Sequence, residues 1–217
     1  MAVIALLGGS FDPVHAGHVA LTERMADLLQ PDSLRLIPAG NPWQKPHSLA
    51  PATDRIAMLE RAFAGMPLPV MIDRQEIERA GPSYAIDTLR AIRAEVGAET
   101  SLVFLIGADQ LQQLHTWRDW RQLFDLAHFC VASRPGFSLD AAQLAAEIRE
   151  ACNQRTGTVA DLRAQPAGRI VLDAGLAFDV SSTAIRLALQ QGKRLTELGL
   201  VPDAVLDYIQ QHHLYQH

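Results

Sequence analysis

The sequence has few cysteines, no long apolar run and no excess of positive charge, and each shortage excludes a class of protein. Two cysteines, Cys130 and Cys152, are too few for a disulfide framework, so we expect two reduced thiols in a cytoplasmic protein. No apolar stretch approaches the roughly 18 residues that span a bilayer. The 217 residues carry 24 acidic and 19 basic side chains, a net charge of −5, which argues against a nucleic-acid surface.

What the chain does contain is an alternation of short apolar runs with longer amphipathic ones. The apolar runs predict strands that are covered on both faces. These strands are expected at Val3–Leu7, Ser33–Pro38, Val70–Asp73, Ser101–Ile106, His128–Ser133 and Arg169–Asp173. The amphipathic runs predict helices at His18–Gln30, Ala52–Ala64, Tyr84–Val96, Ala108–Leu114, Leu139–Gln154, Thr183–Gln191 and Pro202–His212.

This alternation predicts an α/β fold, a Rossmann-like doubly wound parallel sheet with helices on both faces. We expect one domain over residues 1–217, with a small helical appendage from about residue 181. The opening run Ala2–Leu7 lacks a basic start and is interpreted as a strand, not a signal peptide. Because ligands bind beyond the carboxyl ends of the strands in such sheets, a site is expected in the segments that follow them.

Smaller features give local predictions. Ser83 and Ser182 are expected to be helix N-caps, and Gly192 is expected to end a helix. The polar stretch Asn153–Gly168 is expected to be a surface excursion between a helix and a strand.

The most informative segment follows the first expected strand, from Gly8 to His18. Gly8 and Gly9 permit a tight turn and a close approach of the backbone to a ligand. A helix that opens near His18 offers free amides and the positive end of its dipole to an anion. His15 and His18, three residues apart, can face the same side and donate to phosphate oxygens. The segment matches neither a dehydrogenase glycine motif nor a Walker loop, and its histidines lack further residues at zinc-site spacing.

The run GGSFDPVHAGH at residues 8–18 closely resembles the phosphate loop of the nucleotidylyltransferase superfamily. Those enzymes attach a nucleoside monophosphate to a phosphate-bearing acceptor and release pyrophosphate. A second run, DVSSTAIR at residues 179–186, resembles the second motif of the superfamily, and its hydroxyls and guanidinium suit nucleotide phosphates. The two motifs occur in the expected order and at opposite ends of the sheet, which argues against a chance match.

Four further segments resemble the bacterial nicotinate-nucleotide adenylyltransferases, which join ATP and nicotinate mononucleotide into deamido-NAD. The segments are Pro82–Leu89, Ile106–Gln110, Trp117–Trp120 and Ser133–Gly136, and the resemblance runs from about Val3 to Tyr215. It implies an enzyme of NAD biosynthesis, with Mg²⁺ carried by the ATP phosphates and no assigned metal ligand in the protein. The ATP contacts we expect are Gly8, Gly9, Ser10, Phe11, His15, His18, Gly107, Asp109, Arg134, Ser181, Ser182, Thr183 and Arg186.

The acceptor site follows from the same resemblance. Trp117 offers a flat face to a pyridinium ring, and Asp109, after Gly107, is placed to accept ribose hydroxyls. The resemblance implies that backbone amides around Tyr84-Ala85 and Trp117-Arg118 hold the nicotinate carboxylate. Here Ala85 replaces a common hydroxyl residue and Arg118 a common aromatic one. A charge-assisted contact from Arg118 is therefore a hypothesis. The acceptor contacts we expect are Asn41, Lys45, Tyr84, Ala85, Asp109, Trp117 and Arg118.

Three basic residues outside the two motifs are further candidates for the expected site. Lys45 lies in a proline-rich loop, where it could neutralise phosphate charge as the loop closes, although the preceding Trp43-Gln44 departs from the family pattern. Arg55 is a weaker candidate for anchoring a loop, and Arg134 a weaker candidate for contacting ATP. His47 is expected to be exposed.

The expected reaction is a direct in-line displacement without a covalent enzyme intermediate. The acceptor phosphate attacks the α-phosphorus of ATP and pyrophosphate leaves, so catalysis comes from positioning and charge stabilisation. His18 and Arg186 are expected to contact the transition state, and His15 and Lys45 to orient the phosphates. Three alternatives stay open: a pantetheine-phosphate adenylyltransferase, a nicotinamide-mononucleotide adenylyltransferase and a catalytically silent nucleotide-sensing module. The sequence does not predict an oligomeric state.

Overall fold

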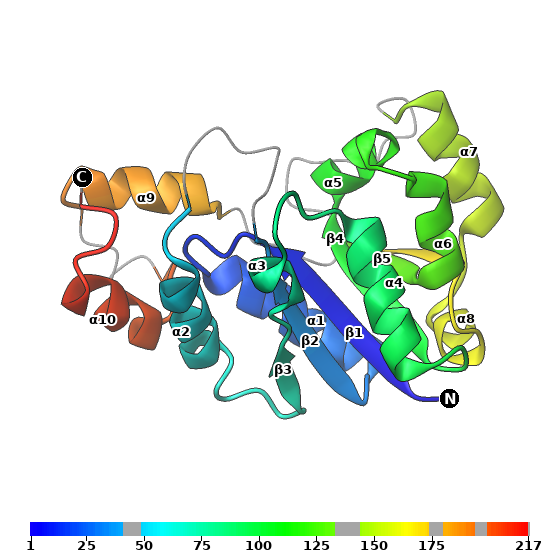
Figure 1. Ribbon diagram of the computed structural model, residues 1–217, viewed down its shortest axis with the longest axis horizontal. Helices are drawn as coiled ribbons and strands as arrows, with labels where there is room; N and C mark the ends of the chain where they lie inside the picture. Colours follow the sequence, from blue (N-terminus) through cyan, green and yellow to red (C-terminus); the bar gives the residue numbers. More distant parts are fainter. Residues whose placement is uncertain (41–48, 133–143, 174–179, 194–198, 217) are drawn as a thin grey trace.

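The computed structural model describes residues 1–40, 49–132, 144–173, 180–193 and 199–216, and Figure 1 shows their arrangement. Six strands form one sheet in the order β3-β2-β1-β4-β5-β6, and every neighbouring pair is parallel. The chain winds outward in both directions from the β1–β4 pair, which confirms the predicted doubly wound fold. The strands are β1 (Val3–Gly9), β2 (Ser33–Pro38), β3 (Val70–Ile72), β4 (Ser101–Gly107), β5 (His128–Ala132) and β6 (Ile170–Asp173).

The helices cover both faces of this sheet because successive strand residues point to opposite sides. Leu7 of β1 belongs to a core cluster that contains Met25 and Leu29, whereas its neighbour Leu6 belongs to a second cluster with Ile86 and Leu89. The larger helices are α1 (Ala16–Leu29), α2 (Ala52–Ala62), α4 (Ala85–Val96), α7 (Ala146–Arg155), α9 (Ser182–Gln190) and α10 (Asp203–Gln211). Shorter ones are α3 (Gln75–Glu78), α5 (Ala108–Gln113), α6 (Leu123–Leu126), α8 (Val159–Ala164) and the 3₁₀ turns η1 (Leu114–Thr116) and η2 (Trp120–Gln122).

The C-terminal helices pack into the first of these two clusters. Ile185 of α9 and Val205 and Ile209 of α10 are buried in the same cluster as Leu7 of β1. Figure 1 shows α10 beside α2, and the Tyr208 hydroxyl donates to Asp54 Oδ1 at 2.8 Å across the α10–α2 contact. The end of the described chain is thereby brought close to the segment that follows β1.

One stretch predicted as a surface excursion contains a helix. The segment Asn153–Gly168 includes the end of α7 and all of α8, and Leu162 of α8 is fully buried. The stretch otherwise runs over the surface between α7 and β6, as expected, with Leu162 its one buried residue. The helix α8 itself was not predicted, because its six residues are too few for a clear amphipathic period. A signal was present: Thr158 and Asp161 form a capping box, with Thr158 Oγ1 accepting the Asp161 amide at 3.3 Å.

In two helices the N-cap is the residue next to the predicted serine. Tyr84 precedes α4, and the Ser83 hydroxyl instead donates to the Glu76 carbonyl at 3.3 Å. Ser181 caps α9 by accepting the Ala184 amide at 3.2 Å, while Ser182 is the first helical residue. Gly192 follows α9 with a φ of +66°, which confirms it as the stop.

The remaining local predictions fall partly on undescribed residues. Of the predicted helix Leu139–Gln154, the part before residue 144 lies outside the described residues, and α7 begins at Ala146. Cys130 and Cys152 are free thiols, as expected, and both are buried. Within the described ranges, no helix is both long and apolar enough to traverse a bilayer.

Candidate functional site

Two cavities adjoin at the carboxyl ends of β1 and β4, where the sheet changes direction. The first, which we call the loop cavity, measures about 380 Å³. Its lining includes Gly8, Gly9, Ser10, His15, Gly17, His18, Gly107, Asp109, Ser181, Ser182 and Thr183. The second, the aromatic cavity, measures about 200 Å³ and shares six residues with the first: Gly8, Gly9, Ser10, Leu105, Ile106 and Gln110. Residues from the two ends of the chain therefore meet at one edge of the sheet.

The segment after β1 turns sharply before α1 begins. Phe11 adopts a φ of +48°, the Asp12–Pro13 peptide is cis, and the Phe11 side chain is fully buried. A Cβ at Gly9 would lie 3.1 Å from the Phe11 ring, so glycine lets the backbone pass over this ring. Phe11 was expected to contact ATP, but its buried side chain packs in the core and leaves only its backbone for such a contact.

His15 and His18 form the start of α1 and lie against one another. His15 is the N-cap residue, and its backbone N–H donates to His18 Nδ1 at 3.2 Å. Because Nδ1 accepts this bond, the neutral His18 ring carries its proton on Nε2. Gly17 makes room for the pair, since a Cβ there would lie 3.1 Å from His15 Nδ1. Both imidazoles line the loop cavity, as the spacing predicted.

Side chains of α2 and α9 donate hydrogen bonds to backbone carbonyl oxygens of the segment between β1 and α1. Arg55 Nη1 donates to the Ser10 carbonyl at 2.9 Å and its Nε to the Ala50 carbonyl at 3.1 Å, which confirms Arg55 as a loop anchor. Arg186 Nη1 donates to the Asp12 carbonyl at 2.6 Å, and the Ser182 hydroxyl to the Pro13 carbonyl at 3.0 Å. Protein donors therefore satisfy oxygens that would otherwise repel a phosphate.

The predicted residues of the second motif lie at two different places in the structure. Ser181, Ser182 and Thr183 line the loop cavity at the N-terminus of α9. Arg186, one turn further on, is held against Asp12 and its Nη2 donates to Thr183 Oγ1 at 3.3 Å. Arg186 therefore contacts both the turn after β1 and the hydroxyl group of Thr183.

The β4 end contributes a carboxylate. Asp109, in the first turn of α5, lines the loop cavity, and a Cβ at Gly107 would collide with its Oδ1. The Gly107 amide donates to Gln110 Oε1 at 3.0 Å, which fixes the start of this helix. A side chain at position 107 would therefore displace the Asp109 carboxylate, and the structure brings both predicted residues to the cavity.

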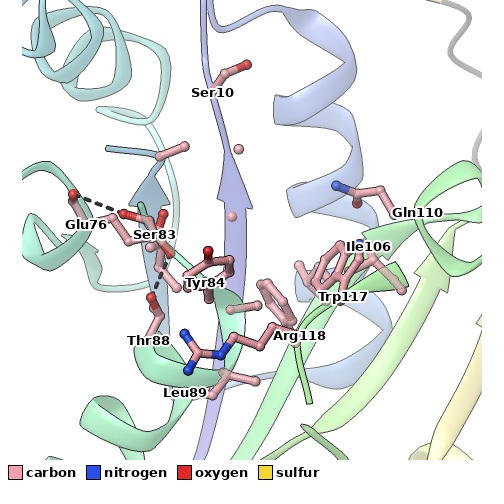
Figure 2. Close-up of a pocket in the computed structure, with 17 residues that line it drawn as sticks. Ser10, Glu76, Ser83, Tyr84, Thr88, Leu89, Ile106, Gln110, Trp117 and Arg118 are labelled. Carbon is pink, nitrogen blue, oxygen red and sulfur yellow. Dashed lines mark hydrogen bonds between the residues drawn. The ribbon is translucent and has the colours of Figure 1, made fainter. Parts of the chain in front are cut away.

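The aromatic cavity contains four of the residues predicted for the acceptor: Tyr84, Ala85, Trp117 and Arg118 (Figure 2). The Arg118 guanidinium lies 4.9 Å from the centre of the Tyr84 ring, a cation–π contact. Trp117 packs edge to face on Phe104, with ring centres 6.3 Å apart. Among the described residues that line this cavity, Arg118 is the only cation and Glu76 the only anion.

Glu76 is a lining residue that the sequence analysis missed. Its Oε1 accepts the Thr88 hydroxyl at 2.7 Å, a bond drawn in Figure 2, and burial raises the pKa of its carboxyl group. It lies on the four-residue helix α3, where neither a motif nor a periodic pattern marks it. Asp12 and Tyr215 were also missed as partners, because 203 positions separate them in the chain.

Three predicted site residues, Asn41, Lys45 and Arg134, lie outside the described residues, as do Trp43, Gln44 and His47. Their roles therefore stay predictions. The remaining predicted contacts lie at one or other of the two cavities or, for Phe11 and Arg186, in the adjoining loop and α9.

A parallel sheet with a glycine–histidine loop at its switch point defines a nucleotide-binding α/β protein. The model of the cytidylyltransferase-like family matches residues 6–188. A relative named probable nicotinate-nucleotide adenylyltransferase, from Herminiimonas arsenicoxydans, is 56% identical over 213 residues, covering 98% of this chain and 96% of its own. The relative of that name from Laribacter hongkongensis is 44% identical, covering 98% and 94%. The chain therefore belongs to the cytidylyltransferase-like family and, within it, to the nicotinate-nucleotide adenylyltransferases, which confirms the resemblance.

A solved structure gives an independent comparison of the fold. The nicotinic acid mononucleotide adenylyltransferase of Plasmodium falciparum, complexed with NaAD, superposes with a TM-score of 0.75. The match covers 99% of this chain and 98% of the other at 18% identity. At that identity the likeness concerns the fold, and it extends over almost the whole chain.

Proposed function

We propose that the protein joins ATP and nicotinate mononucleotide into deamido-NAD and releases pyrophosphate. The observation that carries this proposal is the meeting of the two cavities at Gly8, Gly9 and Ser10. ATP in the loop cavity and a pyridine mononucleotide in the aromatic cavity would bring their reacting phosphates to the same glycine turn. The complex of the Plasmodium enzyme with NaAD supports this choice of substrates.

The chemistry we propose needs no group that removes a proton. The acceptor 5′-phosphate is already anionic near neutral pH, attacks the α-phosphorus of ATP in line, and pyrophosphate leaves. His18 would donate from Nε2 to the phosphates as charge shifts toward the leaving group. Ser181–Thr183 and Arg186 would hold the outer phosphates, His15 and Lys45 would orient them, and Asp109 would accept ribose hydroxyls.

We propose that Mg²⁺ arrives with ATP and is held mainly by its phosphates. Among the residues that the structure describes, no group of three or more His, Cys, Asp and Glu side chains could hold a metal ion. Phosphate oxygens are the hard ligands that Mg²⁺ prefers. Bound in this way, the ion would neutralise charge on the leaving pyrophosphate.

Recognition of nicotinate would come from the aromatic cavity. Trp117 would stack on the pyridinium ring, a contact worth about 0.5–2 kcal/mol. Ala85 brings no hydroxyl, so the proposal gives Arg118 the role of a direct, charge-assisted contact with the carboxylate. Tyr84, beneath the guanidinium, would limit its orientations.

A pyrophosphate-release assay with ATP and Mg²⁺ tests the function. We expect rapid release with nicotinate mononucleotide and much slower release with nicotinamide mononucleotide or phosphopantetheine. Preference for the amide or for phosphopantetheine would identify one of the alternative acceptors. An absence of release with every acceptor, in a chain that binds ATP, would favour the nucleotide-sensing alternative.

A further inference from the structure

We propose that Tyr215, in the C-terminal tail, and Asp12, in the turn after β1, position Arg186 and the phosphate loop for ATP. The inference rests on the proposed function for the identity of the nucleotide. Neither Tyr215 nor Asp12 is among the residues that line the two cavities. Tyr215 and Asp12 act here as positioning residues, which touch the machinery and not the reacting atoms.

Asp12 is the point at which four segments of the chain meet. Its side chain is 2% exposed. Oδ1 accepts the Tyr215 hydroxyl at 2.7 Å and the Ala50 amide, just before α2, at 3.1 Å. Oδ2 lies 3.7 Å from Arg186 Nη1, which completes an ion pair between a buried carboxylate and a partly buried guanidinium of α9. A buried carboxylate with these partners has little freedom to move, because each lost contact would leave a charge or a donor unsatisfied.

Arg186 is tied to this aspartate in two ways. The same Nη1 donates to the Asp12 carbonyl at 2.6 Å, so both the backbone and the side chain of Asp12 locate the guanidinium. Arg186 in turn contacts Thr183 Oγ1 at 3.3 Å, and Thr183 lines the loop cavity. A displacement of Asp12 would therefore be transmitted to the N-terminus of α9 and to the turn after β1 at once.

The tail adopts an unfavourable backbone conformation in order to reach Asp12. His213 and Tyr215 have φ values of +52° and +63°, in the left-handed region that large L-residues rarely adopt. Such a conformation persists where its surroundings hold it, and here Leu214 and Tyr215 pack on the core. Burial and the neighbouring Asp12 charge raise the pKa of Tyr215, so its hydroxyl remains a donor throughout the neutral range.

A second tyrosine in the same part of the chain supplies a matched control. The Tyr208 hydroxyl also donates to an aspartate, Asp54 Oδ1, at 2.8 Å, but this bond links the C-terminal region to α2 and not to the turn after β1. Asp54 lies in the first turn of α2 and is not among the residues that line either cavity. Removing the two hydroxyls compares the same chemical change near the phosphate loop and away from it.

The test compares Tyr215→Phe with Tyr208→Phe in the full chain. We expect Tyr215→Phe to raise the KM for ATP about tenfold, the effect of losing one hydrogen bond to a charged group, with the KM for nicotinate mononucleotide within about twofold. Tyr208→Phe should keep both constants. Equal kinetic constants in the two variants would overturn the proposal, whatever their melting temperatures. If Tyr215→Phe does not fold, Asp12→Asn is measured in its place, with the same expected rise and the same contrary outcome.

A double-mutant cycle tests whether the tail acts through Arg186. In an Arg186→Ala background, we expect Tyr215→Phe to cause no further loss of ATP affinity, because the group that it positions is gone. Additive losses would overturn this link. ATP affinity is measured by calorimetry without an acceptor, so this cycle can be read even if the wild-type chain releases no pyrophosphate. Failure of the proposed function is thereby distinguished from failure of the positioning role.

Discussion

The rings of His15 and His18 are stacked, with centroids 3.8 Å apart and planes inclined by 30°. A hydrogen bond from the His15 backbone N–H to His18 Nδ1 holds the two rings in this arrangement at the start of the 14-residue helix α1. An anion in the loop cavity would therefore meet the Nε2–H of His18 and the positive end of the helix together. The stacked pair makes the sequence motif into a preorganised donor site, and this preorganisation can be tested.

His18→Ala should lower kcat about 10²- to 10³-fold and change the KM for ATP little. The reason is that a donor aimed at developing charge stabilises the transition state more than the bound substrate. Steady-state pyrophosphate release would measure both constants. His115→Ala, at an exposed histidine of η1, is the control and should behave as wild type. Turnover of His18→Ala within twofold of wild type would contradict the assigned role.

Gly17→Ala should lower kcat about tenfold or more with the protein still folded. The new methyl group would lie 3.1 and 3.2 Å from two atoms of the His15 ring, so the stacked pair would have to shift. The ring would have to move by a few tenths of an ångström, and rates fall steeply when positioned groups are misplaced. Gly65→Ala is the matched control, because a Cβ there meets no atom within 4 Å. Similar kcat values for the two alanine variants would refute this steric argument.

Trp117→Ala should weaken the binding of nicotinate mononucleotide about 2- to 30-fold, the range expected for a lost cation–π stack. The KM for ATP should stay the same, because Trp117 lines the aromatic cavity and not the loop cavity. Trp117→Phe, which retains a flat ring, should recover part of the affinity. Fluorescence titration with each substrate measures the effect, and equal losses for the two would rule out stacking.

Arg118→Gln should reduce the preference for nicotinate over nicotinamide mononucleotide about tenfold, since a charge-assisted hydrogen bond to a carboxylate is lost. The ratio of kcat/KM for the two acceptors measures this preference. Arg121→Gln is the matched control, because Arg121 also lies over an aromatic ring, that of Trp120 at 4.4 Å, but outside the aromatic cavity. An unchanged ratio in Arg118→Gln would leave carboxylate recognition to the backbone amides.

The stability of the protein should depend on pH through His128. The ring is fully buried, Nδ1 accepts the Arg169 amide at 3.0 Å, and Nε2 donates to the Gln165 carbonyl at 2.8 Å. Burial lowers the pKa of His128, so below about pH 6.5 the unfolded chain takes up a proton that the folded protein resists. This histidine should therefore decrease the free energy of unfolding by up to about 1.4 kcal/mol per pH unit as the pH falls from 6.5 toward the folded pKa.

Urea unfolding of wild type and His128→Gln between pH 5 and 8 would measure this contribution. The variant should be less stable at pH 8 and have a shallower pH dependence between pH 5 and 6.5. His115→Gln, at an exposed position, should keep the wild-type slope. Parallel curves for wild type and His128→Gln would show that another group is responsible.

The sequence by itself determined the sheet and the centre of the site. Strand positions followed from apolar runs, and each described strand lies within two residues of its prediction at either end, because burial on both faces requires continuous apolar side chains. The stretch from Gly8 to His18 could be interpreted equally well, because its eleven residues encode a turn, a helix start and two hydrogen-bond donors. The short helices α3 and α8 escaped prediction because a single turn has too few residues for a period.

Only the tertiary structure decided which distant residues support that centre. The contact of Asp12 with Tyr215 spans 203 positions, and that of Asp12 with Arg186 spans 174. Neither pair has a local pattern, because a contact across the fold depends on how helices dock on the sheet and not on spacing along the chain. Local chemistry encoded the phosphate loop, and packing of the C-terminal helices against β1 and α2 decided what holds it in place.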